Sequence, residues 1–261
     1  MARIDTQYLP TVMDSRRVAL ARVEVIAARL RTPTDASGFL LAFLALRVGP
    51  LRRVPEWLQA SAEGCMAAHP GVAVDLFETA RLERNQQLVL LEDLVELRVC
   101  TPGIDFRALI REPFDPRIEQ HLRVRKLVPT GLVPAIVLAI DLELSLLERD
   151  GGAVLLDACG GAVGCAFLRL RQASAERRVR ARLRQLRAIL DEQPIYSATS
   201  WAKIASRVLL SYVDSLEACA TARSLSPHYQ GPPAASRKLS HARPLRVRLA
   251  RTAYERGWAG S

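Results

Sequence analysis

The chain has 261 residues, of which 49% are hydrophobic and 5% aromatic, so it can bury a full core within one large domain. Five cysteines with no Cys-x-x-Cys pair exclude a disulfide framework and indicate small buried side chains of a reducing compartment. The formal net charge of +10 belongs largely to residues 224–261, where seven basic residues and one acidic residue give +6.

Apolar residues at helical spacing predict an all-α protein, and we find neither an alternating strand pattern nor an internal repeat. Residues 32–35, Thr-Pro-Thr-Asp, end the first helix and cap the second, while Gly49-Pro50 is expected to end the second. The glycines at 160, 161 and 164 are expected to weaken a long later helix. The predicted helices cover residues 13–31, 39–48, 55–68, 72–98, 117–126, 132–147, 154–190 and 200–222.

Residues 1–223 are therefore expected to form one helical domain, followed by a basic tail over residues 224–261 that is expected to be disordered. The tail is interpreted as a solvated terminus, with an arm for nucleic acid as the alternative. We expect no signal peptide, and the most apolar segment, residues 128–147, carries Asp141 and Glu143 and is interpreted as a buried helix. These features predict a soluble, cytoplasmic protein with no membrane span.

The segment over residues 78–97, ETARLERNQQLVLLEDLVEL, carries polar side chains inside an apolar stripe. Glu83, Gln86 and Gln87 share a helical face with leucines, because residues three or four positions apart lie above one another. Burial of a carboxylate without a compensating group is costly, so this face is a candidate site. The leucines of the stripe are Leu76, Leu90, Leu94 and Leu97.

Within this segment, residues 82–94 resemble a motif of the haem-oxygenase-like superfamily, and more narrowly of its iron-containing redox enzymes. In that motif a glutamate is followed three residues later by histidine, and seven residues on by Asp-Leu. Glu83 and Asp93-Leu94 match the pattern, but Gln86 stands at the histidine. The resemblance extends over about residues 37–222 and implies a haem-oxygenase-like bundle of about seven or eight helices.

Two further stretches carry the same resemblance. Residues 131–145 resemble the helix that contributes another metal-binding carboxylate, which would be Glu143. Residues 167–179 resemble a helix with a His-x-x-x-Asp-x-x-His run, whose places here are Arg171, Ala175 and Arg178. Arginine and alanine cannot ligate iron, and glutamine is a weak neutral ligand, so the metal site implied by the resemblance is degenerate.

A charge-swap hypothesis accounts for this pattern. If Glu83 and Glu143 still point into the bundle, Arg171 and Arg178 on a facing helix can neutralise them in place of metal ions. The alternative is that both arginines extend to solvent from a surface stripe, together with Arg169, Arg177, Arg180, Arg182 and Arg184.

The resemblance then implies a non-catalytic or altered-chemistry relative of these enzymes, which binds a small molecule or a partner protein as an accessory of a biosynthetic pathway. No cofactor is expected; one alternative is an iron-dependent oxidoreductase that uses Glu83 and Glu143. Haem is not indicated, because haem oxygenases of this superfamily use a histidine on the first helix and residues 13–31 contain none. A second alternative is nucleic-acid association through the tail, and a homodimer is also left open.

Overall fold

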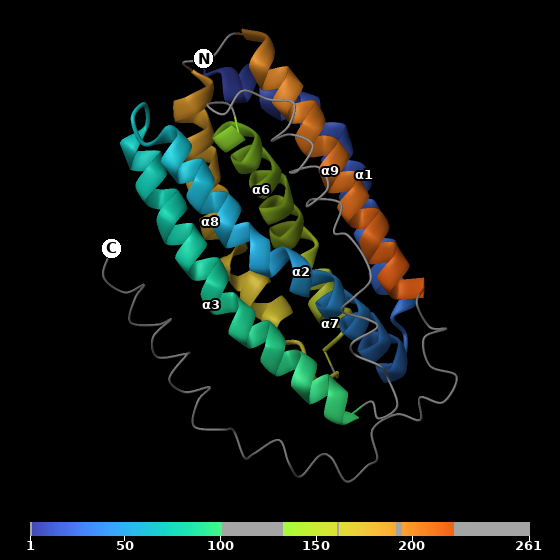
Figure 1. Ribbon diagram of the computed structural model, residues 1–261. Helices are drawn as coiled ribbons and strands as arrows, with labels where there is room; N and C mark the ends of the chain where they lie inside the picture. Colours follow the sequence, from blue (N-terminus) through green and yellow to red (C-terminus); the bar gives the residue numbers. More distant parts are fainter. Residues whose placement is uncertain (1, 101–132, 161, 192–194, 222–261) are drawn as a thin grey trace.

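The computed structural model describes residues 2–100, 133–160, 162–191 and 195–221. Within these ranges the protein is all-helical, with eight helices and no strand, which confirms the predicted all-α class (Figure 1). The predicted helix over residues 117–126 and the basic tail lie outside the described residues. The helices are η1 (Ile4–Tyr8, a short π-helix), α1 (Leu9–Arg29), α2 (Pro33–Cys65), α3 (Pro70–Cys100), α6 (Val133–Asp150), α7 (Gly152–Ala158), α8 (Ala166–Leu190) and α9 (Ile195–Thr221).

The cap of helix α2 lies where the sequence predicts it, but the helix begins at Pro33, before the predicted start at residue 39, and ends later than expected. Thr32 accepts a hydrogen bond from the backbone N–H of Asp35 at 3.1 Å, and Asp35 accepts one from the N–H of Thr32 at 3.2 Å. This reciprocal capping box satisfies backbone donors that the first helical turn leaves without partners. The predicted stop at Gly49-Pro50 is wrong, because α2 runs through it to Cys65. Packing along α3 supplies contacts that outweigh the weak helix propensity of these two residues.

The long helix predicted over residues 154–190 is divided in two. Helix α7 ends at Ala158 and α8 begins at Ala166, so the break falls in the glycine-rich stretch that the sequence marks as weak. Gly164 has a φ of +81°, which L-residues with a side chain rarely adopt. A Cβ atom there would also lie 2.7 Å from the side chain of Leu97, so glycine is required twice over.

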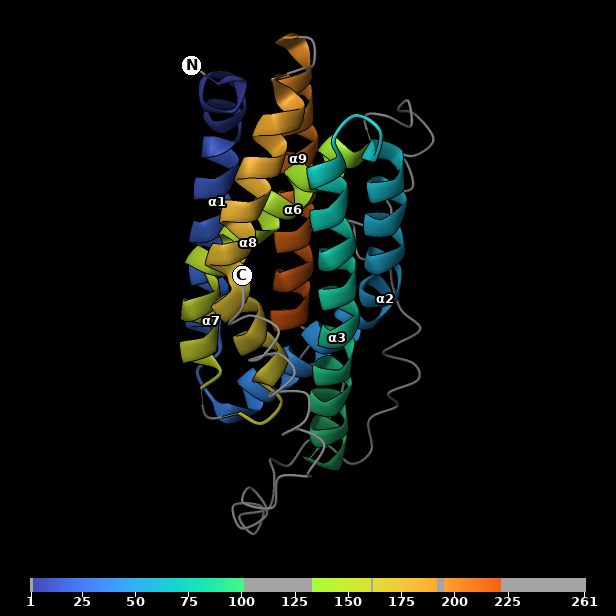
Figure 2. The same ribbon diagram turned by 90° about the vertical axis from the view of Figure 1, so that its left-hand side faces the viewer.

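Helix α6 lies at the centre of the bundle, between α8 and α9 (Figures 1 and 2). Nearly every described residue from Ala135 to Leu147 is buried, as expected for a helix surrounded by others. Helices α2 and α3 form a neighbouring antiparallel pair, and α1 packs along α9. Trp57 and Trp201 are buried, as are four of the five cysteines: Cys65, Cys159, Cys165 and Cys219.

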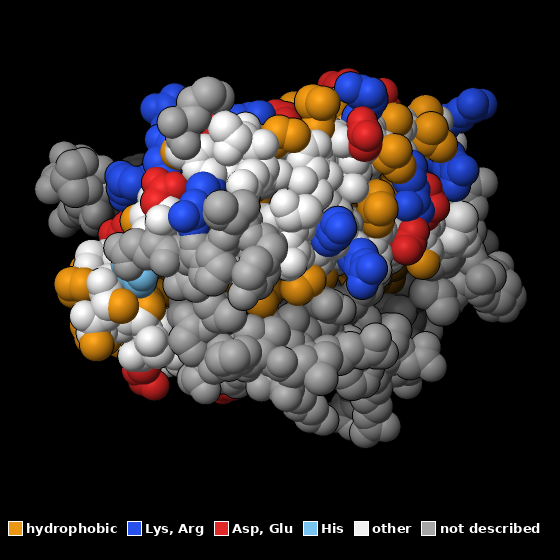
Figure 3. Space-filling model, turned by 90° about the horizontal axis from the view of Figure 1, so that it is seen from above, with side chains coloured by type: hydrophobic (Ala, Val, Ile, Leu, Met, Phe, Trp, Pro, Cys, Tyr) orange, Lys and Arg blue, Asp and Glu red, His pale blue; other side chains and the backbone are white. Residues whose placement is uncertain are grey.

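No helix in the described part of the chain is both long enough and apolar enough to cross a membrane. Seen from one end, the bundle surface carries positive and negative side chains close together, and a histidine is visible at this end (Figure 3). Within the described residues that histidine is His69, which lies in the turn between α2 and α3. The three other histidines, His121, His228 and His241, lie outside the described residues.

Candidate functional site

Helix α8 directs a row of long polar side chains into the bundle. Arg171, Arg178, Arg182 and Gln185 are spaced seven, four and three residues apart, so they lie on one helical face. Each is at most 8% exposed. Buried guanidinium groups are tolerated only where carboxylates and hydrogen-bond acceptors surround them. The partners of this row therefore define the candidate site.

Arg171 joins α8 to both α3 and α6. Its Nη1 donates to Oε1 of Glu83 at 2.6 Å and to Oε1 of Gln86 at 3.0 Å. The other edge of the Arg171 guanidinium faces Glu148. Nη2 of Arg171 lies 3.0 Å from Oε2 of Glu148, and Nε of Arg171 donates to both oxygens of that carboxylate. The Glu83–Arg171 part of the charge-swap hypothesis is thus confirmed. One guanidinium lies between two carboxylates from different helices.

Glu148 is the carboxylate on which three arginines converge. Besides Arg171, it accepts a hydrogen bond from Nη2 of Arg178, and Nη2 of Arg47 lies 3.9 Å from its Oε1. Burial by itself raises the pKa of Glu148, but the charges of Arg171, Arg178 and Arg47 outweigh burial and hold it well below its usual range. Arg178 also donates to Oγ of Ser145 at 3.2 Å. We call these residues the Arg171 network: Arg47, Glu83, Gln86, Ser145, Glu148, Arg171 and Arg178.

A second buried ion pair extends the same helical interface. Nε of Arg182 lies 2.5 Å from Oδ2 of Asp141, and its other nitrogens donate to Gln185 and Thr79. Burial is the largest influence on the pKa of Asp141 and raises it, but the charges of Arg182, Arg178 and Arg171 and the hydrogen bond from Arg182 together lower it below its ordinary value. The alternative interpretation of the sequence places Arg182 on a solvent-exposed stripe. In the structure Arg182 is only 1% exposed. Arg169, Arg177, Arg180 and Arg184 are exposed, as that reading expects.

Glu143 does not join the Arg171 network, which corrects the second half of the charge-swap hypothesis. Arg178 binds Glu148, whereas Glu143 forms a bidentate pair with Arg16 of α1, at 2.5 and 2.7 Å. Oη of Tyr8 donates to Glu143 at 2.9 Å. Five residues of an α-helix turn through about 140°, so Glu143 and Glu148 face different neighbours.

The six positions that the sequence singled out are all buried, but they do not form one cluster. Glu83, Gln86, Arg171 and Arg178 belong to the Arg171 network, Ala175 is buried on the same helix, and Glu143 lies on another side of α6. Sequence reasoning missed Glu148, Arg47, Arg16 and Tyr8. A signal existed for Glu148, because Asp141, Ser145 and Glu148 follow helical spacing within a strongly apolar helix.

Asp93, the other motif carboxylate, joins α3 to the start of α8. It accepts hydrogen bonds from the backbone N–H groups of Phe167 at 2.7 Å and Ala166 at 3.2 Å. These donors belong to the first turn of α8, which has no intrahelical partner for them. Burial raises the pKa of Asp93 to about 6, although both N–H groups act in the opposite direction. Asp93 therefore holds two helices together.

The resemblance implies iron, and the residues present do not fit it. Around Glu83 the polar partners are a guanidinium and an amide, and Ala175 offers no ligand. A permanently charged arginine 2.6 Å from the carboxylate would repel a divalent cation placed there. Within the described ranges, no three histidine, cysteine, aspartate or glutamate side chains are grouped to hold a metal ion.

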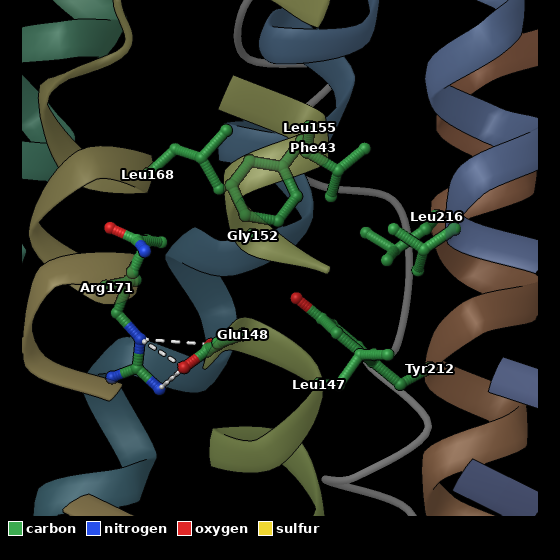
Figure 4. Close-up of a pocket in the computed structure, with 11 residues that line it drawn as sticks. Phe43, Leu147, Glu148, Gly152, Leu155, Leu168, Arg171, Tyr212 and Leu216 are labelled. Atoms are coloured by element: carbon green, nitrogen blue, oxygen red, sulfur yellow. Dashed lines mark hydrogen bonds and ion pairs between the residues drawn. The ribbon is translucent and has the colours of Figure 1, made fainter. Parts of the chain in front are cut away.

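A small cavity lies beside the Arg171 network (Figure 4). The paired side chains of Arg171 and Glu148 border it on one side, and mostly apolar side chains, including Phe43, Leu155 and Leu216, border the rest. Its volume is about 20 Å³. That is room for roughly one water molecule, whereas sites for small organic ligands typically have about 300 Å³ or more.

Comparisons with protein-family models, with curated proteins and with solved structures find no match to this chain.

Proposed function

We propose that this protein is a haem-oxygenase-like bundle whose metal site has been replaced by an arginine–carboxylate network, and that it acts by binding rather than by iron redox chemistry. The observation that carries this proposal is Arg171, whose guanidinium binds Glu83, Gln86 and Glu148 at once. In the family that the sequence resembles, the corresponding motif glutamate and histidine are metal ligands. A role as an accessory of a biosynthetic pathway rests on analogy with that family.

The electrostatics of the network support the loss of metal binding. Glu83 and Glu148 already have full compensation from buried cations, so a divalent ion would have to displace Arg171. The displaced guanidinium would remain buried, because its side chain is 3% exposed and packed between helices. Leaving a buried charge without its partner costs about 3–5 kcal/mol, which metal binding would have to offset.

The small size of the cavity favours a partner protein over a small molecule as what this protein binds. The cavity beside the network accommodates little more than water, and the side chains of Arg171 and Glu148 that border it are already hydrogen-bonded to each other. A protein partner would instead use the outer surface, where α1 exposes the apolar side chains Met13, Val18 and Val25. The iron-dependent alternative has no comparable support, because Glu83 and Glu143 bind different arginines on different helices.

Anaerobic iron loading tests the proposal. The purified protein is incubated with excess Fe(II), desalted, and its iron content is measured by mass spectrometry, beside a Glu83→Gln/Glu143→Gln variant. We expect the wild type to retain no more iron than the variant, and its melting temperature to be unchanged by Fe(II), since a ligand that binds the folded state raises stability. Stoichiometric iron in the wild type that is lost in the variant would refute the proposal.

A further inference from the structure

The outer face of α3 carries an apolar stripe on its C-terminal half. Leu88, Leu91 and Val95 are 57%, 46% and 62% exposed, and their spacing of three and four residues places them on one face. Figure 2 shows α3 at the front of the bundle, with α2 on one side and α8 on the other. Contiguous exposed apolar side chains on a soluble domain commonly mark an interaction surface.

Charged residues border this stripe in a definite order. Arg81 and Arg84 precede Leu88, whereas Glu92 and Glu96 follow it, and all four are exposed. Because Arg81 pairs with Glu78 at 2.9 Å, Arg84 supplies the net positive charge before Leu88, and Glu92 and Glu96 make the face negative after it. The distance along the helix from Arg84 to Glu92 is about 12 Å, with Leu88 midway between them.

We propose that this face of α3 binds the same face of a second copy of the chain, with the two helices antiparallel and a two-fold axis near Leu88. In a two-fold contact, residue i meets residue j and j meets i. An axis at Leu88 brings Arg84 opposite Glu92 of the partner subunit, because both are four residues from the axis. It brings Arg81 close to Glu96 of the partner subunit. Leu88 of the two copies meets on the axis with Leu91 of each copy beside it, and Val95 lies opposite the aliphatic stem of the partner's Arg81, because both are seven residues from the axis.

The charge order favours a second copy over another occupant. A helix that is positive on one half and negative on the other complements itself when antiparallel and repels itself when parallel. The same order gives an unrelated protein no comparable match. A single helix pair lies at the small end of protein interfaces, below about 1,200 Å² in total, so we expect a dimer that dissociates on dilution at micromolar concentrations. This inference does not depend on what the bundle interior binds.

Sedimentation velocity over a series of concentrations tests the contact on the full chain. We expect the wild type to dimerise and Leu88→Glu to dimerise at least about tenfold more weakly, since the two new carboxylates would face each other on the axis in place of two leucines. The matched control is Val74→Glu on the same helix, because Val74 is also 57% exposed but lies about 21 Å from Leu88. This control should dimerise like the wild type.

Charge reversal supplies a second, independent test. Arg84→Glu and Glu92→Arg should each weaken dimerisation, and the double variant R84E/E92R should restore it, because each new charge then faces its opposite. Melting temperatures check that each variant is folded. A wild type that stays monomeric, a double variant that is not restored, or a Leu88→Glu variant that loses thermal stability equally at every concentration would each overturn the proposal. The last result would indicate that another segment of the same chain covers the stripe.

Discussion

Buried carboxylates lie on two sides of α6, and the structure neutralises them differently. Towards α8, Glu148 meets Arg171, whose side chain is 3% exposed, so both charges are removed from water. Towards α1, Glu143 is fully buried, but the side chain of its partner Arg16 is 26% exposed. One side is a closed network of several arginines, and the other is a single pair that reaches the surface.

This difference in exposure determines how much stability the fold loses when one arginine is removed. A buried ion pair costs desolvation on both partners, so loss of one partner leaves the other without compensation. When the removed arginine was partly exposed, water can enter its place and hydrogen-bond to the carboxylate that remains. The α8 side should therefore be the more fragile of the two, although its hydrogen bonds are more numerous. Three measurements on variants test this difference in stability between the two sides of α6.

The largest effect is expected for Arg171→Ala. Its removal leaves Glu83 without its guanidinium and takes one of the arginines from Glu148, so the free energy of unfolding should fall by about 4 kcal/mol. Urea unfolding followed by circular dichroism measures this loss. The control is Arg169→Ala, two residues earlier on the exposed side of α8, which should leave stability nearly unchanged. Equal losses in both variants would contradict the importance of the network.

A smaller loss is expected for Arg16→Ala on the α1 side. Glu143 keeps its hydrogen bond from Tyr8, and water can enter the space that Arg16 leaves, so we expect a loss of about 2 kcal/mol. The neighbouring Arg17→Ala is the control, because the side chain of Arg17 is 74% exposed. If Arg16→Ala lowered the free energy of unfolding as much as Arg171→Ala, the partial exposure of Arg16 would not explain a difference between the two sides.

The smallest effect concerns pH and the α8 side. Because the folded state holds the pKa of Glu148 below its unfolded value, this carboxylate stabilises the fold above about pH 4.3. That contribution is lost as pH falls through the folded pKa. Between pH 6 and pH 3, the wild type should lose about 1.5 kcal/mol more unfolding free energy than Glu148→Gln. The exposed control Glu24→Gln should follow the wild type, and identical pH profiles for all three would count against this assignment.

Most helices could be predicted from the sequence, because burial of an apolar face leaves a periodic pattern in the chain. The cap of α2 at Thr32 and the burial of Leu76, Leu90, Leu94 and Leu97 on α3 follow from local residues alone. The continuation of α2 through Gly49-Pro50 could not be predicted in this way. Contacts along α3 decide it, and those contacts come from residues distant in sequence.

The candidate site was only partly predictable. The spacing of Glu83, Gln86, Arg171 and Arg178 indicated buried polar faces, and the pairing of Arg171 with Glu83 is confirmed. The partners of Glu143 could not be identified, because Arg16 lies 127 positions away and nothing in the sequence around it marks it as the partner of a buried carboxylate. Helical spacing tells which residues share a face, but it does not tell which helix that face meets.

The sequence alone shows that this protein is helical, that α3 carries polar residues within an apolar face, and that histidine is missing from the motif positions. Periodicity and residue chemistry are local properties, so one chain suffices to read them. Only the tertiary structure decided that Glu148 rather than Glu143 faces α8, and that Arg171 binds Glu83 and Glu148 together. The physical reason is that a rotation of about 140° between two positions of α6 assigns each carboxylate to a different neighbour, and the packing of whole helices sets that rotation.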